Sequence, residues 1–320
     1  MKSEELFGSA LLFPTMRKKV CLLCVLLLLC TVIQGQDRSQ ATSLRKAYKQ
    51  NSTSLLYQFF DNWSNAVSSN ENEANSKWVA EAHKIFAAFY QPLQLERIGC
   101  RSEDKDLYKD MPYFIVQNTL NAIYVADDIP VGPDEYEAYF TNRINQMYSE
   151  DSIRKEYLGD LRKEIDSGDL YYDFDFEWEG DSWTKIPTTK VGSKITFRPP
   201  IYFPNKKIVY LTNKYKRLLN SFLRNKHVGF AKESIMQVAY SKGESRKRMD
   251  FINTAARIFY GHWGGYWQYE TYPQASSIVI DSQMQRAVVF FRFVYQGGEV
   301  ILEKQNGEWT IVSGRFTWIE

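Results

Sequence analysis

The residues best suited to hold a ligand form an aromatic, glycine-containing run in the last third of the chain. Its rings are His262, Trp263, Tyr266, Trp267, Tyr269 and Tyr272, and Gly264 and Gly265 lie among them. Trp and Tyr rings offer a large contact area at low entropic cost, so they stack well on sugar faces or line a groove. We therefore predict a binding site at His262, Trp263, Tyr266, Trp267 and Tyr269. Packing of these rings in the core is the alternative.

A second run, residues 173–181, alternates acidic with aromatic side chains. On a strand, the period of two places its five carboxylates on one face: Asp173, Asp175, Glu177, Glu179 and Asp181. Side chains on one face of a strand are about 6.6–6.8 Å apart, which is wide for several carboxylates to bind one cation. We interpret the run as a solvated edge strand whose charges discourage aggregation. A divalent-cation or ligand site is the alternative.

The chain offers few residues for catalysis. Its histidines are His83, His227 and His262, and only His262 has a candidate acid–base partner, Glu270. A nucleophile elbow, a phosphate-binding loop, an HExxH motif and a dinucleotide-binding fingerprint are all absent from the sequence. We predict no catalytic residue, no metal site and no cofactor.

The N-terminal segment has the pattern of a secretory leader. Arg17, Lys18 and Lys19 precede an apolar run over residues 20–33 and a small polar stretch over residues 34–36. The apolar run is shorter than the roughly 20 residues that span a bilayer. We predict that residues 1–36 form a signal peptide, with translation starting at Met1 or at Met16. The mature protein would then be periplasmic or extracellular, with no integral membrane span.

Lipidation at Cys30 is the alternative to simple cleavage after residue 36. Leu29 precedes this cysteine, whereas a small residue is usual there. Cys21 and Cys24 also lie in the leader, so Cys100 would be the one cysteine of the mature chain. An intramolecular disulfide is then excluded, and we expect Cys100 to be a small buried hydrophobe.

Removal of the leader also leaves the chain without net charge. The full chain has 40 basic and 38 acidic residues, and the leader holds four of the former and two of the latter, which leaves 36 of each. Proteins that bind nucleic acids normally carry a basic excess, so we predict no nucleic-acid partner. The basic segment Lys242, Arg246, Lys247 and Arg248 is interpreted as a solvated face, with contact to an anionic surface as the alternative.

Hydropathy patterns predict an α+β protein, with a helical N-terminal part followed by a C-terminal helix and a curved antiparallel β-meander. Helical spacing of apolar residues occurs over residues 48–67, 78–89, 136–148, 153–165, 211–223 and 245–260. Residues 113–125 have the pattern of a strand or a hairpin, and strand patterns also occur over residues 277–280, 286–295, 299–304, 309–312 and 315–319. Asn306-Gly307 predicts a hairpin turn, and residues 296–298 predict another. We expect a mainly helical region over residues 37–204 and a second domain over residues 205–320.

The strand at residues 286–295 is apolar on both faces, which predicts a central strand. Val289, Phe291 and Phe293 alternate with Val288 and Phe290. We expect the helix at residues 245–260 to cover one of these faces.

The order of elements over residues 205–320 resembles the cone-shaped nuclear-transport-factor-two-like (cystatin-like) fold. It consists of a helix, a short strand near residues 235–239, the helix at 245–260 and the curled sheet. The run over residues 261–267 and the closing residues 317–320 are similar to those of uncharacterised exported proteins of Bacteroidota. The resemblance implies a pocket between sheet and helices, which members of the family use for small-molecule binding or for isomerase and dehydratase chemistry. No residue of this chain matches their catalytic positions.

Two functional hypotheses follow. The first is a non-enzymatic binding or interaction protein of the cell envelope, whose partner is a small molecule, a glycan or an envelope protein. The alternative is a small-molecule enzyme of the isomerase, dehydratase or hydrolase type that uses a pocket in the C-terminal cone. A polar pocket with a perturbed acid or histidine inside the C-terminal sheet would favour the enzyme.

Overall fold

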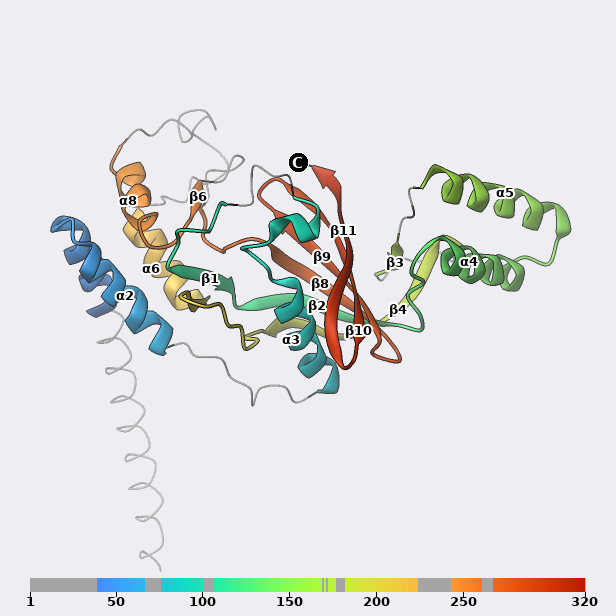
Figure 1. The fold of residues 1–320 in the computed structure, drawn as a ribbon, viewed down its shortest axis with the longest axis horizontal. Helices are drawn as coiled ribbons and strands as arrows, with labels where there is room; N and C mark the ends of the chain where they lie inside the picture. Colours follow the sequence, from blue (N-terminus) through green and yellow to red (C-terminus); the bar gives the residue numbers. More distant parts are fainter. Residues whose placement is uncertain are drawn as a thin grey trace, which may run out of the picture.

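The fold was analysed in a computed structural model of the 320-residue chain (Figure 1). The structure describes residues 39–66, 76–100, 106–168, 170, 172–176, 182–223, 243–260 and 267–319. The leader, the strand expected near residues 235–239 and the glycine pair at 264 and 265 lie outside the described residues.

The helices follow the apolar stripes of the sequence. Residues 39–49 are helical, and the chain bends at Asn51, where φ is 46°, before α2 begins. The helices that follow are α2 (Thr53–Ala66), α3 (Lys77–Phe89), the short 3-10 helix η2 (Leu95–Ile98), α4 (Pro133–Met147), α5 (Asp151–Ser167), α6 (Asn213–Leu223) and α8 (Glu244–Ile252). Helix α5 ends at Gly168, whose φ of 76° is a left-handed conformation that glycine adopts without strain.

Seven strands form the main sheet, in the order β11-β10-β9-β8-β2-β4-β3. Their bounds are β2 (Thr119–Ala126), β3 (Asp173–Asp175), β4 (Lys185–Thr196), β8 (Gln274–Asp281), β9 (Arg286–Phe293), β10 (Gln296–Gln305) and β11 (Glu308–Ile319). The antiparallel meander β8–β11 is confirmed, and β2 extends it by pairing in parallel with β8. The α+β class is thereby confirmed.

Two smaller sheets complete the strands. β1 (Tyr113–Gln117) pairs in parallel with β5 (Lys207–Leu211), and β6 (Phe259–Tyr260) pairs with β7 (Trp267–Gln268). The hairpin considered for residues 113–125 is therefore wrong, since β1 and β2 belong to different sheets. The main sheet takes strands from both sides of the boundary expected between residues 204 and 205.

Three local expectations are corrected. The helix at residues 245–260 ends at Ile252, because the Asn253 side chain accepts the backbone N–H of Ile258 at 2.7 Å and closes a turn. Residues 296–298, where a turn was expected, belong to β10. The chain reverses just before them, at Val294 and Tyr295, and Val294 has a φ of 54°. Residues 309–319 form one bulged strand, where two had been expected.

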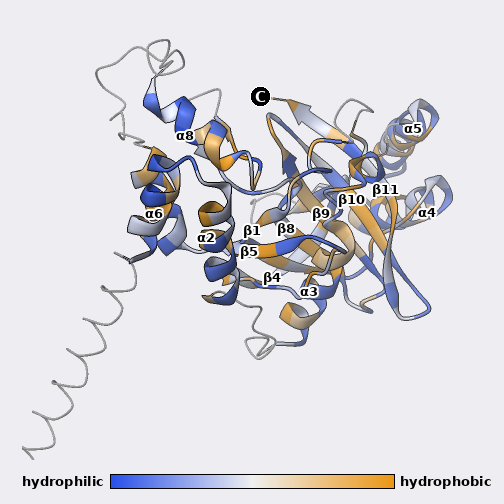
Figure 2. Cartoon of the chain, turned by 60° about the vertical axis from the view of Figure 1, so that its left-hand side comes forward, coloured by the Kyte–Doolittle hydropathy of each residue, from blue (hydrophilic) through white to orange (hydrophobic). Residues whose placement is uncertain are grey.

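Both faces of β9 are covered, as its alternation predicted. Val289, Phe291 and Phe293 belong to the larger core cluster, and Val288 belongs to a second cluster on the opposite face. The prediction that the helix at residues 245–260 covers one face of β9 is wrong. Helix α3 lies across the first face, and the ring of Phe89 lies 5.9 Å from that of Phe291. Figure 2 shows the hydrophobic residues gathered along β8, β9 and β10.

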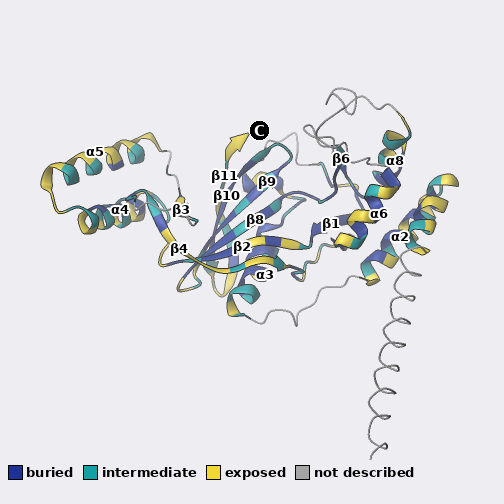
Figure 3. Ribbon diagram, turned by 180° about the vertical axis from the view of Figure 1, so that it is seen from behind, coloured by how far each residue is buried: buried dark blue, intermediate teal, exposed yellow. Residues whose placement is uncertain are grey.

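The second face of the sheet is covered by the α4–α5 helical hairpin. Tyr136, Phe140 and Ile144 of α4 pack in the second cluster with Val279 and Val288 of the sheet. This hairpin lies at one end of the sheet and its outward sides are exposed (Figure 3). The cover therefore reaches only part of the second face.

A buried carboxylate fixes α3 to the β10–β11 hairpin. Trp309 Nε1 donates to Glu81 Oε1 at 2.7 Å, Lys304 pairs with the same oxygen, and Lys84 lies 3.2 Å from Oε2. Burial opposes ionisation of Glu81, but the hydrogen bonds from Lys304, Trp309 and Lys84 outweigh it and lower the pKa of this carboxyl. The anion therefore holds the helix in place.

We predict that Phe291→Ala lowers the free energy of unfolding by about 3–5 kcal/mol, because the change empties a buried aromatic site. Phe291 is 2% exposed. Tyr202→Ala serves as the matched control, since Tyr202 is 83% exposed and its removal leaves no cavity. Chemical denaturation measures both variants, and equal stabilities for the two would show that Phe291 is not a core residue.

Candidate functional site

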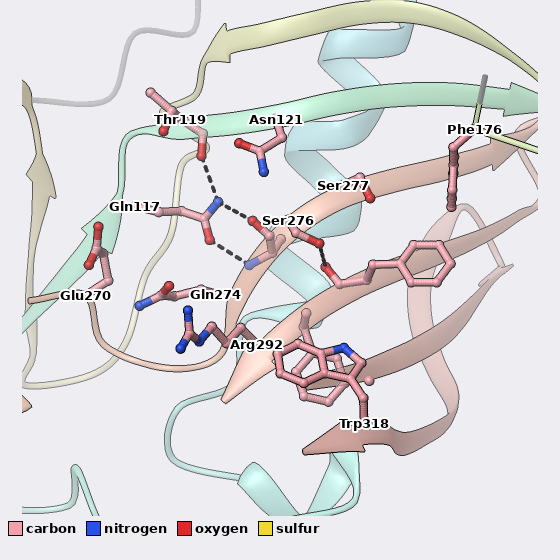
Figure 4. Close-up of a pocket in the computed structure, with 14 residues that line it drawn as sticks. Gln117, Thr119, Asn121, Phe176, Glu270, Gln274, Ser276, Ser277, Arg292 and Trp318 are labelled. Carbon is pink, nitrogen blue, oxygen red and sulfur yellow. Dashed lines mark hydrogen bonds between the residues drawn. The ribbon is translucent and has the colours of Figure 1, made fainter. Parts of the chain in front are cut away.

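A cavity of about 570 Å³ lies on the second face of the sheet (Figure 4). None of its lining residues belongs to the α4–α5 hairpin. It is lined by Gln117, Thr119, Asn121, Phe176, Glu270, Gln274, Ala275, Ser276, Ser277, Phe290, Phe291, Arg292, Gly298 and Trp318. Its size is that of ligand pockets, which run from about 300 to 1,000 Å³. The mixed lining combines aromatic rings with amides, hydroxyls and one charge of each sign.

The buried Gln117 amide holds one side of this cavity. Its nitrogen donates to the carbonyl oxygens of Thr119 and Ala275 at 2.9 and 2.8 Å, and its oxygen accepts the Ala275 N–H at 2.7 Å. The ladder between β2 and β8 starts only at Ser277, and the register of β8 against β9 shifts between Ala275 and Ser277. The Gln117 side chain therefore forms the hydrogen bonds with the Ala275 backbone that strand β2 does not form.

The rim of the cavity carries an exposed tryptophan. Trp318 is 45% exposed and lies opposite Gly297 in the β10–β11 register. A β-carbon placed on Gly297 would lie 2.1 Å from the Trp318 indole, so the ring rests directly on the glycine backbone. A β-carbon on Gly298 would instead lie 1.9 Å from the Arg315 carbonyl oxygen. Gly297 therefore leaves space for the Trp318 side chain, and Gly298 leaves space for the backbone of β11.

The two charged side chains and the Phe176 ring lie toward opposite ends of the cavity. Gln274, Arg292 and Glu270 lie toward one end, and the Phe176 ring lies at the other (Figure 4). Arg292 is oriented by its Nε, which donates to the Val294 carbonyl at 3.0 Å. The rings of Phe176 and Phe290 meet edge to face at 5.4 Å. This arrangement suits a ligand that has hydroxyl or amide groups and one apolar face.

A smaller cavity of about 270 Å³ lies farther along the same face and contains a buried acid. Glu299 is 4% exposed, and its Oε1 accepts Nε and Nη2 of Arg315 at 2.8 and 2.6 Å. Burial raises the pKa of Glu299 even though the Arg315 charge opposes the shift. Tyr172 lines the same cavity, and burial, with the nearby Glu299 charge, raises its pKa to about 12.

The structure locates two of the five residues predicted to bind a ligand. Trp267 and Tyr269 are 8% and 1% exposed and belong to the larger core cluster. Tyr269 donates its hydroxyl to Asn220 at 2.5 Å, and the Trp267 ring meets that of Tyr260 edge to face. His262, Trp263 and Tyr266 lie outside the described residues, so binding through the aromatic run stays a prediction.

Other sequence features fall in different places. Glu270, the candidate partner of His262, lines the large cavity, and Cys100 is buried as expected. The start of the acidic run forms β3, which is an edge strand of the main sheet as interpreted, while residues 177–181 lie outside the described residues.

Two further features are absent from the described part of the chain. There, no three His, Cys, Asp or Glu side chains are grouped so as to hold a metal ion. No described helix combines the length and the apolar character needed to cross a membrane.

Apart from Glu270, the polar residues that line the two cavities were not singled out as site residues from the sequence. Gln117 and Trp318 lie within predicted strands, and the Ala275 partner of Gln117 comes from a distant part of the chain. Glu299 carried no distinguishing signal, because Glu303 stands at the other end of the same short apolar run.

No protein-family model matches the chain, and comparisons with curated proteins and with solved structures found no match. The functional argument therefore depends on the geometry of the cavities.

We predict opposite consequences for alanine at the two neighbouring glycines. Gly298→Ala should lower the free energy of unfolding by about 1–3 kcal/mol, because β10 must move away from the Arg315 carbonyl. Gly297→Ala should stay within about 0.5 kcal/mol of the parent, because the exposed Trp318 ring can swing away. Chemical denaturation compares the two, and equal losses would contradict the separate roles assigned to the glycines.

Proposed function

We propose that the protein is an exported, non-enzymatic binding protein whose large cavity holds a polar ligand with an apolar face, such as a glycan fragment. The observation that carries this proposal is the exposed Trp318 ring, which rests on Gly297 beside a cavity lined by amides and hydroxyls. Sugar rings combine an apolar face with hydroxyl groups, so they match both parts of the lining.

Each part of the lining has a separate role in this proposal. The Trp318 ring stacks on the apolar face of the ligand, while Asn121, Gln274 and Ser277 exchange hydrogen bonds with its hydroxyls. The Trp318 ring already lies against the Gly297 backbone, so less side-chain freedom is lost when a ligand stacks on its exposed face. Gln117 is fully engaged with the backbone and supports the site without touching the ligand.

The leader and the fold resemblance belong to the same proposal. A signal peptide at residues 1–36 would deliver the protein to the periplasm or the exterior, where glycans and envelope proteins are available. The nuclear-transport-factor-two-like resemblance would account for a pocket on a curled sheet that is partly covered by helices.

The proposal predicts that Trp318→Ala weakens ligand binding by about tenfold or more, a loss of roughly 1.4 kcal/mol. Ligands are first identified by a thermal-shift screen of neutral oligosaccharides on the mature protein, and affinities are then measured by calorimetry. Ile319→Ala is the control, since Ile319 is adjacent, 72% exposed and outside the cavity lining. Binding that is equal in both variants would refute the proposal.

An enzyme is the second candidate, and one observation favours it. Glu299 is a buried acid of raised pKa in a cavity of the C-terminal sheet, which is the feature expected of a general acid or base. The test measures conversion of a bound small molecule by the two variants. Conversion that is lost in Glu299→Gln but retained in Trp318→Ala would favour the enzyme.

A further inference from the structure

A separate hollow of about 340 Å³ lies where the helix over residues 39–49 meets α6 and α8. These helices lie at the end of the molecule away from the α4–α5 hairpin (Figures 1 and 3). The hollow is lined by Arg45, Tyr48, Lys49, Ser221, Phe222 and Arg248. Three of the six lining residues are therefore cations, and the other polar side chains carry hydroxyls.

Arg248 is held rigidly in this hollow. Its guanidinium lies 5.3 Å from the centres of both the Tyr48 and the Phe222 rings. Its Nη1 donates to the Phe222 carbonyl at 2.6 Å, and its Nε donates to Glu244 at 3.1 Å. The side chain is only 12% exposed. A planar guanidinium fixed in this way is preorganised to bind an oxyanion, because little rotamer entropy remains to be lost.

Arg45 and Lys49 add two positive charges to the hollow beside Arg248. They stand one helical turn apart on the same side of the helix, where like charges repel and destabilise it. Arg45 Nη2 donates to Ser221 Oγ at 3.2 Å, which directs the guanidinium over the hollow. Among the described residues, neither cation forms an ion pair, and Glu244 is the one carboxylate bonded to Arg248. The hollow thus has an excess of two positive charges.

A purely structural role accounts for Arg248 but not for the cluster. Arg248 satisfies a carbonyl in the last turn of α6, which is a common C-terminal capping interaction. Arg45 and Lys49 contribute nothing to that cap, and their repulsion from Arg248 opposes it. A bound anion would remove this repulsion and link the three helices.

We propose that this hollow is a binding site for a phosphate group, carried either by a small solute or by a lipid headgroup. Guanidinium groups donate paired hydrogen bonds to phosphate oxygens, and the ammonium of Lys49 supplies a compact third charge. The Ser221 hydroxyl provides a further donor at the wall, while the Tyr48 hydroxyl is engaged with Glu244 and Arg248. This site is distant from the large cavity and independent of the function proposed for it.

The test measures the melting temperature of the mature protein while inorganic phosphate replaces chloride at constant ionic strength. Phosphate should raise the melting temperature in the parent, because a ligand that binds the folded state stabilises it. The Arg45→Gln/Lys49→Gln double variant should show at least a tenfold weaker apparent affinity. Arg248 is left unchanged, since its loss would also remove the α6 cap.

Lys46→Gln is the matched control, because Lys46 is exposed on the same helix and lies outside the hollow. It should retain the full response to phosphate. Equal shifts in the parent, the control and the double variant would overturn the site, as would the absence of any shift in the parent.

Sedimentation with vesicles distinguishes the two sources of phosphate. Binding to phosphatidic acid vesicles that the double variant loses, with no binding to phosphatidylcholine vesicles, would assign the site to a lipid headgroup. Protection by soluble phosphate without vesicle binding would assign it to a solute. Vesicle binding that the double variant retains would exclude this hollow as the lipid site.

Discussion

The two apolar faces of the central strands are the constraint on which the rest of the structure depends. Because β8 and β9 carry hydrophobic side chains on both faces, each face needs a cover of its own. Helix α3 supplies the first, and the α4–α5 hairpin with β3 supplies part of the second. Where that second cover stops, the strands change to polar residues such as Asn121, Ser277 and Arg292, and the large cavity opens. The candidate site is thus a direct consequence of how far the helical hairpin reaches.

Two buried carboxylates show how the same side chain acquires different properties in different surroundings. Glu81 has three donors and a lowered pKa, so the stability it contributes is present above the ordinary pKa of a glutamate and is lost as the pH falls through its lowered value. Glu299 has a raised pKa because burial outweighs its single cationic partner. The stability linked to its protonation is complete at low pH and is lost as the pH rises through the raised value. Glu81 therefore stabilises the packing of α3 on the β10–β11 hairpin, whereas Glu299 is suited to proton transfer or polar recognition.

Local patterns predicted the individual elements well. The alternation of Val288 to Phe293 identified a strand buried on both faces, and Asn306-Gly307 marked a hairpin that the structure confirms. The parallel pairing of β2 with β8 joins segments about 155 residues apart, so no local pattern could reveal it or identify α3 as the cover. Gln117 and the basic hollow share this origin, since each gains its partners only when distant segments meet. The glycine pair at 297 and 298 was misread as a turn because glycine also permits the close contacts of a bulged strand.

The central claim is that the Gln117 amide bonds the backbone of β8 at Ala275, before its pairing with β2 begins at Ser277, and so holds the cavity open there. Amide hydrogen exchange at Ala275 tests it most directly, because this N–H bonds to the Gln117 oxygen. In Gln117→Met, which keeps the size of the side chain and removes both hydrogen-bonding groups, the Ala275 amide should exchange at least tenfold faster. The amide of Ile280, within the paired part of β8, should keep its protection. Unchanged protection at Ala275, or equal loss at both positions, would contradict the account.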